Sequence, residues 1–135
     1  MDTPRPTGTA LPPDTVAQVV ATLTKAMAVD RLFLDPELTV DKLGRHIQLP
    51  PKLISAVLNQ HMHKNFNGFV NTYRIDEVKA RLTNPANAYL TLTGIALESG
   101  FNSQATFQRA FRQQVGLSPK EFLARQPINT AQIQI

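Results

Sequence analysis

Hydrophobic residues recur along most of this chain at intervals of three and four positions, which is the spacing of an amphipathic α-helix. The first stripe follows Pro13 and Asp14, which are typical of a helix start, and it consists of Val16, Val19, Val20, Leu23 and Met27. We expect this helix to pack on the chain's own core. Homodimerisation through the stripe is the second interpretation.

The segments 38–49 and 90–101 share one pattern of apolar and polar residues, in which matching positions lie 52 residues apart. This constant offset indicates an internal duplication of one helix-turn-helix unit. Gly100 suits the sharp turn of the second copy, because glycine adopts positive φ without strain. Gln48 stands at that place in the first copy, so the first turn is either strained or of another type.

Each turn leads into a second helix with an apolar inner side. In the second copy, Asn102 or Ser103 is expected to cap this helix, and Phe107 and Phe111 lie four residues apart on the inner face. Its polar side carries Gln104, Gln108, Arg109 and Arg112. The corresponding helix of the first copy runs over about 51–61, and its outer side carries Lys52, Ser55, Ala56 and Asn59. Amides and arginines on the outside of such a corner are typical of a helix that reads a DNA major groove.

A predicted turn at 64–68 and a long helix at 69–82 separate the two copies. Ser118, Pro119 and Glu121 predict a last helix that begins with a capping box. The expected fold class is all-α, with two helix-turn-helix subdomains joined by a long central helix and an extra N-terminal helix. The expected divisions are a disordered leader or linker remnant (1–12), the N-terminal amphipathic helix with a clip (13–37), the first subdomain (38–66), the connecting helix (67–84), the second subdomain (85–126) and a tail (127–135).

Composition narrows the class of protein. The 135 residues include no cysteine and no apolar run long enough to span a membrane, and the N-terminus lacks the features of a secretory signal. We therefore expect a cytoplasmic chain that makes no membrane contact itself. Charge is uneven: residues 1–41 hold three basic and six acidic side chains, and residues 42–135 hold eleven and four. A basic body indicates a polyanionic partner, although a merely solvated basic surface gives the same pattern.

The sequence contains no catalytic or metal-binding constellation. His61 and His63 are two positions apart, so on a helix their side chains point about 200° apart and cannot share a metal ion. There is neither a zinc-binding helix motif nor a glycine-rich phosphate loop. We expect no metal, no cofactor and no enzymatic activity.

Two stretches carry a more specific pattern, GIALESGFNSQATFQRAF at 94–111 and GLSPKEF at 116–122. With the first copy they resemble the AraC/XylS family of bacterial transcription regulators over about residues 38–124. The resemblance implies two helix-turn-helix subdomains joined by a long helix, and sequence-specific binding to double-stranded DNA at promoters. It also implies a usual role as an activator, with RNA polymerase as a further partner.

The resemblance implies roles for particular residues. The base-reading positions of the family fall on Lys52, Ser55 and Ala56, to which we add Asn59 from the same outer face, and on Gln104, Ala105, Gln108 and Arg109. Alanine cannot donate to a base edge, so Ala56 and Ala105 would act through methyl contact or DNA shape. The expected phosphate contacts are Lys64, Asn102, Ser103 and Arg112.

Residues 32–39 and 71–75 further resemble a branch of the family in which the DNA-binding region ends a longer, often membrane-embedded, sensor protein. That resemblance implies that this chain is a C-terminal piece. The competing hypothesis is a helical protein-interaction module, which would bind a protein partner through the N-terminal stripe and the basic body.

Overall fold

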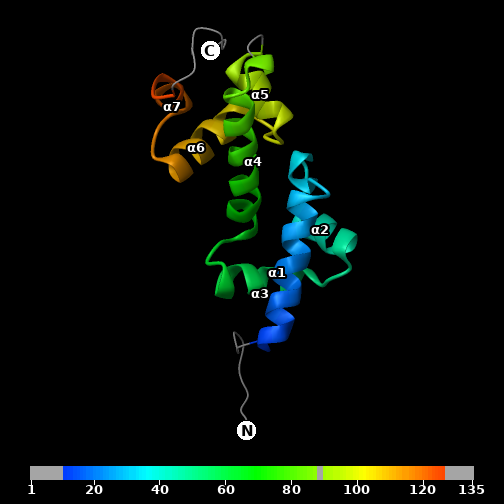
Figure 1. Cartoon of the computed structure of the whole chain (residues 1–135). Helices are drawn as coiled ribbons and strands as arrows, with labels where there is room; N and C mark the ends of the chain where they lie inside the picture. The colour runs from blue at the N-terminus through cyan, green and yellow to red at the C-terminus, as the bar shows by residue number, and fades with distance from the viewer. Residues whose placement is uncertain (1–10, 88–89, 127–135) are drawn as a thin grey trace. The chain divides into compact units, whose positions relative to one another are not determined.

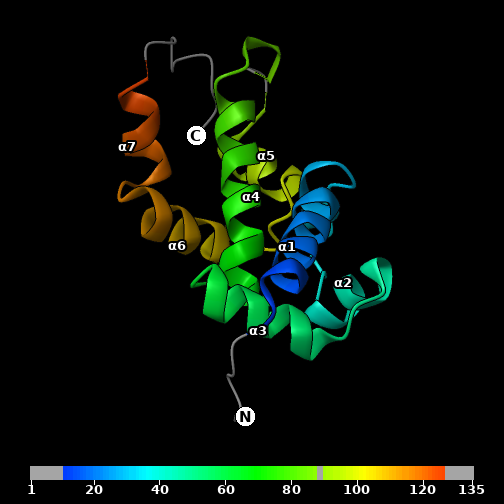
Figure 2. The same ribbon diagram turned by 60° about the horizontal axis from the view of Figure 1, so that its bottom comes forward.

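The computed structural model describes residues 11–87 and 90–126, and every regular element within these ranges is helical (Figures 1 and 2). The α-helices are α1 (Pro13–Ala28), α2 (Val40–Ile47), α3 (Pro51–His61), α4 (Phe66–Leu82), α5 (Leu92–Glu98), α6 (Gln104–Val115) and α7 (Pro119–Ala124). Two short 3-10 helices are η1 (Leu32–Leu34) and η2 (Pro85–Asn87). The predicted all-α class is confirmed. Most of the expected leader and all of the expected tail lie outside the described residues.

The chain forms two compact units. Among the described residues, 11–32 and 38–69 belong to the first unit, and 33–37 and those from 70 onward belong to the second. The chain therefore leaves the first unit after residue 32, returns after residue 37 and leaves again after residue 69. We call residues 33–37 the strap.

The first unit is built around the stripe of α1. Helix α1 packs on α2 and α3, and three members of its stripe, Val19, Leu23 and Met27, are buried. The other helices contribute Leu43 from α2 and Ile54, Val57 and Leu58 from α3, all buried. The prediction that this stripe packs on the chain's own core is confirmed.

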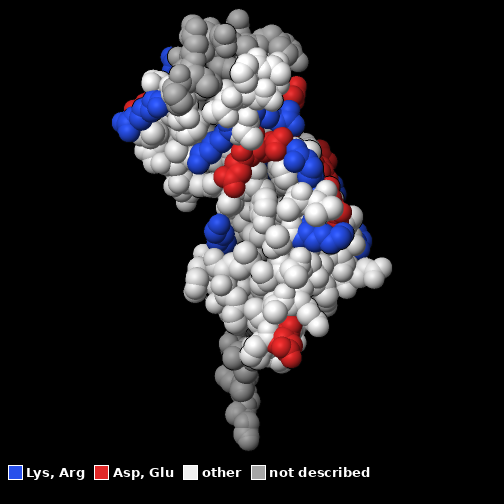
Figure 3. Space-filling view, in the orientation of Figure 1, with Lys and Arg blue, Asp and Glu red and all other residues white. Residues whose placement is uncertain are grey.

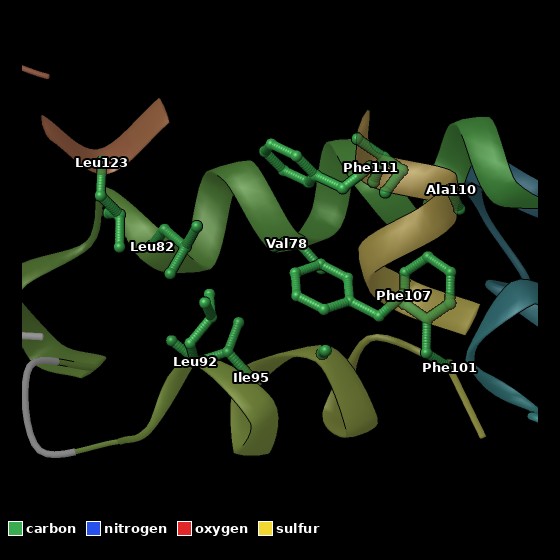
Figure 4. Packing of buried hydrophobic residues seen from close by; sticks show 11 residues of the cluster. Val78, Leu82, Leu92, Ile95, Phe101, Phe107, Ala110, Phe111 and Leu123 are labelled. Carbon is green, nitrogen blue, oxygen red and sulfur yellow. The ribbon is translucent and has the colours of Figure 1, made fainter. Parts of the chain in front are cut away.

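The second unit has an aromatic core. Its buried residues are Ile75, Val78, Leu82, Leu92, Ile95, Ala96, Phe101, Phe107, Ala110, Phe111 and Leu123. Figure 4 shows the rings of Phe101, Phe107 and Phe111 gathered where α4 and α6 meet. The ring of Phe107 lies 5.4 Å from that of Phe101 and 5.7 Å from that of Phe111, measured between centroids. Tilted and edge-on pairs of this kind are favourable beyond their buried area.

Most helix ends follow local sequence signals. Pro13 and Pro51 occupy the first turns of α1 and α3, as predicted. The capping box of α7 is confirmed: the backbone N–H of Glu121 donates to Ser118 Oγ at 3.1 Å, and the backbone N–H of Ser118 donates to Glu121 Oε1 at 2.8 Å. None of the helices in the described ranges has both the length and the apolar character needed to cross a membrane.

One predicted boundary is wrong. Helix α4 begins at Phe66 and not at residue 69, so residues 66–68 of the expected turn at 64–68 are helical. The reason is that Asn65 Oδ1 accepts a hydrogen bond from the backbone N–H of Gly68 at 2.7 Å. This is the bond of an N-cap, so an Asn and a Gly that favour turns in general here start a helix.

At Gly100 the strap and the second corner approach each other closely. Its φ is +108°, and a Cβ placed there would lie 2.1 Å from the carbonyl oxygen of Phe33 and 3.2 Å from Leu34 Cα. Backbone atoms at these distances cannot be avoided by rotating a side chain. Only glycine fits without moving the strap.

We predict that Gly100→Ala lowers the free energy of unfolding by at least about 3 kcal/mol, because it combines a disfavoured φ with a backbone clash. Gly116→Ala is the matched control. Residue 116 also has positive φ, +84°, but a Cβ there would meet no atom within 4 Å, so its cost is the conformational one of about 1 kcal/mol. Urea unfolding of both variants measures the difference, and equal costs would contradict the close approach.

Candidate nucleic-acid interface

The second corner, α5 to α6, sets where the expected reading helix begins. Phe101 donates its backbone N–H to the carbonyl oxygen of Ala96 at 3.2 Å, which closes the turn after α5. Ser103 then caps α6, since its Oγ accepts from the backbone N–H of Thr106 at 3.1 Å. Asn102, the other candidate cap, lies exposed in the turn. The first turn of α6 is thereby held by local bonds, and its remaining backbone N–H groups suit contact with an anion.

The polar side of α6 lies on the surface. Phe107, Ala110 and Phe111 are buried on the inner side, whereas Gln104, Ala105, Arg109 and Arg112 are exposed and Gln108 is half-buried. We call these five outward residues the second ridge. The predicted orientation of this helix is therefore correct, and the ridge is accessible to a macromolecule.

A cleft of about 250 Å³ borders the second ridge. Its lining comes from three helices and from the cap of α7, namely Leu92, Thr93, Gln104, Gln108, Ser118 and Lys120. Two ridge glutamines thus lie beside a hydroxyl and an ammonium group that sequence reasoning did not select. No local pattern points to Thr93 or Lys120, because they share a surface with α6 only through the packing of α5 and α7.

The first corner, α2 to α3, uses the same kind of turn. Gln48 caps α2 with φ 60° and ψ 43°, which is left-handed, so the first of the two alternatives for this turn holds. The backbone N–H of Leu49 donates to the carbonyl oxygen of Gly44 at 3.0 Å, as Phe101 does to Ala96 in the second copy. Gly44 is needed here, because a Cβ would lie 2.7 Å from the carbonyl oxygen of Leu49.

The outer side of α3 is less charged than that of α6. Lys52 and Asn59 are exposed, and Ser55 and Ala56 are half-buried. We call these four residues the first ridge. No side chain caps α3, because Pro50 occupies the N-cap position.

The two ridges correspond with an offset of 53 and not 52. The buried residues of α3, Ile54, Val57 and Leu58, match those of α6, Phe107, Ala110 and Phe111, only at this spacing. The extra residue lies in the second turn. Lys52, Ser55, Ala56 and Asn59 therefore correspond to Ala105, Gln108, Arg109 and Arg112. Two arginines thus replace an alanine and an asparagine in the second ridge.

Charge on both ridges is of one sign. Neither α3 nor α6 contains an Asp or Glu, and on the face shown in Figure 3 the first unit is mostly uncharged. Glu121 of α7 is a carboxylate that interacts with the charge of Arg112 on α6. The pKa of Glu121 is lowered, mainly by the hydrogen bond from the backbone N–H of Ser118 and more weakly by the charges of Arg112 and Arg125.

The remaining expected contacts lie at the ends of helices. Lys64 is exposed and follows the end of α3. His61 and His63 are also exposed, and His63, with φ 57°, lies beyond α3. Within the described part of the chain, no group of three or more His, Cys, Asp or Glu side chains is arranged to hold a metal ion.

Comparison with known proteins gives relatives of one kind. Residues 43–125 match a helix-turn-helix domain family. An HTH-type transcriptional regulator of Staphylococcus aureus (strain COL) is 29% identical over 99 residues, which cover 73% of this chain and 13% of that protein. The regulator YtdP of Bacillus subtilis (strain 168) is 25% identical over 88 residues, covering 65% and 11%. The chain therefore spans about one eighth of the length of these relatives.

Solved structures share the fold. The C-terminal domain of AraT, a response regulator from Geobacillus stearothermophilus, has a TM-score of 0.65 at 20% identity and covers 90% of this chain and 92% of that one. An AraC-type DNA-binding transcriptional regulator from Chromobacterium violaceum has a TM-score of 0.63 at 19% identity, with coverages of 83% and 99%.

The duplicated corners and their exposed ridges define a helix-turn-helix DNA-binding protein. The chain belongs to the AraC-type family of helix-turn-helix transcriptional regulators. The relatives that it matches over this region are HTH-type transcriptional regulators.

We predict that the charge of Glu121 stabilises the capped α7 in a pH-dependent way. Its folded pKa lies below the ordinary value of 4.5, so the stabilisation is present above pH 4.5 and is lost as the pH falls through the lower, folded pKa. Glu121→Gln keeps a capping side chain but removes the charge. The urea midpoint of the wild type should exceed that of the variant at pH 7, and the two midpoints should converge as the pH falls through the lowered pKa of Glu121. A difference that does not change with pH would contradict this assignment.

Proposed function

We propose that this chain binds promoter DNA sequence-specifically by placing α3 and α6 in successive major grooves of one duplex. The second ridge is the observation that carries the proposal. Most of it is exposed, it holds Arg109 and Arg112 without a carboxylate on the same helix, and the inner side of the helix packs in an aromatic core. The repeated corner supports two such helices, and α4 is a single helix with residues in both units. Major grooves on one face of B-DNA recur about every 34 Å, so a stiff connection lowers the ordering cost of docking both.

The side chains suggest different roles in DNA binding for the two ridges. Arg109 has the forked donors that recognise the O6 and N7 of guanine, and Gln104 and Gln108 can pair with adenine. Ala105 offers only a methyl group, which suits the methyl of thymine. The first ridge has one cation, Lys52, so we propose that it contributes more to positioning on phosphates than to base discrimination. Lys64, Asn102, Ser103 and Arg112 are the proposed phosphate contacts.

The resemblance to the family supports an activating role, with RNA polymerase as a partner. A place at the end of a longer sensor protein is likewise a proposal, and the long relatives are consistent with it. Homodimerisation through the α1 stripe is not favoured, because Val19, Leu23 and Met27 are buried in the first unit. The same burial weighs against the competing interaction module.

We expect Arg109→Ala to weaken binding to the preferred sequence by about 1–3 kcal/mol and to relax the preference at one base pair. Selection of bound sequences from random DNA identifies that site, and repeating it with the variant locates the relaxed position. Arg125→Ala is the control, because it also removes one exposed positive charge but lies at the end of α7. Equal losses by both variants on all sequences would refute base reading by Arg109.

We expect Arg112→Gln to behave as the loss of a phosphate contact. Affinity should fall by a similar factor on preferred and unrelated duplexes, and the slope of log K against log salt should decrease by about 1. Titrations at several salt concentrations measure this slope. An unchanged slope with altered base preference would instead make Arg112 a base-reading residue, as its correspondence to Asn59 allows.

A further inference from the structure

Arg74 of α4 connects the strap to the second corner. Its Nε donates to the carbonyl oxygen of Phe33 at 2.8 Å, and its Nη2 donates to the carbonyl oxygen of Asp35 at 2.8 Å. The centre of the same guanidinium lies 5.9 Å from the centroid of the Phe101 ring. One side chain therefore contacts two strap carbonyls and the aromatic residue that follows the turn.

These contacts need an arginine. The guanidinium is planar and has donors at fixed angles, so it can bond to two carbonyl oxygens while its face lies on a ring. A lysine ammonium lacks this geometry. Arg74 is half-buried, and burial lowers the pKa of its guanidinium while the charge of Asp35 opposes that shift. A partly desolvated cation of this kind depends on its partners.

The strap lies in direct contact with the turn at Gly100. The carbonyl oxygen of Phe33 occupies the space that a Cβ at residue 100 would need, and the ring of Phe33 stacks on Tyr73 at 6.0 Å. Movement of the strap toward the turn would therefore displace the backbone at Gly100. A displacement of the turn would also displace α6, because the ring of Phe101 packs on that of Phe107 at 5.4 Å and Ser103 caps α6 two residues after Phe101.

We propose that Arg74 is a positioning residue for sequence recognition: by holding the strap on the Gly100–Phe101 turn, it sets the orientation of the second ridge without touching DNA. The inference rests on the proposed function of that ridge. Its consequence is that discrimination between sequences depends on a residue of α4. In the chain, the strap lies between α1 and α2. A displacement of either helix can therefore move the strap and, through it, the Gly100–Phe101 turn.

The test compares Arg74→Ala and Arg74→Lys with Lys79→Ala. Lys79 lies on the same helix, carries the same charge and also faces a phenylalanine ring, that of Phe122 at 5.8 Å, but Phe122 belongs to α7. Each variant is titrated with the duplex selected by the wild type and with a scrambled duplex of equal length. Amide hydrogen exchange is followed at Gly100 and Phe101, whose N–H groups donate to Leu97 and Ala96.

Arg74→Ala should raise the Kd for the selected duplex about tenfold, as expected for lost hydrogen bonds to a charged group, and that for the scrambled duplex less than about twofold. Exchange at Gly100 and Phe101 should become about tenfold faster relative to the α6 amides. Arg74→Lys should shift both readouts in the same direction, because lysine cannot replace both bonds. Lys79→Ala should leave the ratio of the two Kd values unchanged.

The inference is overturned if Arg74→Ala keeps the wild-type ratio, weakens both duplexes equally or leaves exchange at the turn unchanged. If circular dichroism shows that this variant is unfolded, Arg74→Lys decides by the same two readouts. A wild-type chain that binds both duplexes equally would refute the proposed function instead, and the exchange rates alone would then decide whether Arg74 positions the turn.

Discussion

The carbonyl oxygen of Phe33 and the backbone of Gly100 approach each other so closely that no side chain fits between them. This contact joins a segment between α1 and α2 to a turn that comes more than sixty residues later. The aromatic core, the cap at Ser103 and the outward direction of the second ridge all follow in sequence from the turn. Backbone geometry at this contact therefore fixes where α6 begins, and side-chain packing then holds α6 in place.

The two corners solve one geometrical problem with different residues. Both turns need a left-handed residue, which is Gln48 in the first and Gly100 in the second. The first corner avoids a clash through Gly44, one helical turn earlier, whereas the second has no room at the turn itself. Aliphatic residues fill the inner side of α3 and phenylalanines that of α6. Larger rings bury more apolar area per residue, so the second corner can hold its arginine-bearing ridge firmly.

Binding and discrimination depend on different physical terms in this molecule. Affinity for a polyanion requires only a surplus of positive charge on the ridge, and α6 itself contains two arginines and no Asp or Glu. In the proposed function, discrimination requires the donors of Arg109 and the two ridge glutamines to meet base edges at fixed angles. An error of about an ångström in the position of α6 would weaken discrimination between bases, but it would hardly change the general attraction to a polyanion. This difference is the reason for the proposal that Arg74, which does not touch DNA, affects specificity more than general affinity.

Features that depend on a few neighbouring residues followed from the sequence alone: the helical periods, the cap at Ser118, the glycine turn and the outward side of α6. Such features arise from backbone hydrogen bonds and packing within a turn or two of helix. The sequence left the cap of α6 open between Asn102 and Ser103, and the structure places it at Ser103. The early start of α4 did not follow from the sequence, because Asn is common both in turns and at helix N-caps. Only the folded structure shows that Asn65 caps α4. The tertiary structure alone decided that the strap joins the second unit, that Arg74 bonds to a carbonyl 41 positions away, and that Thr93 and Lys120 line a cleft beside the ridge. These contacts unite residues far apart in the chain, and their geometry comes from the packing of whole helices, which no local pattern encodes.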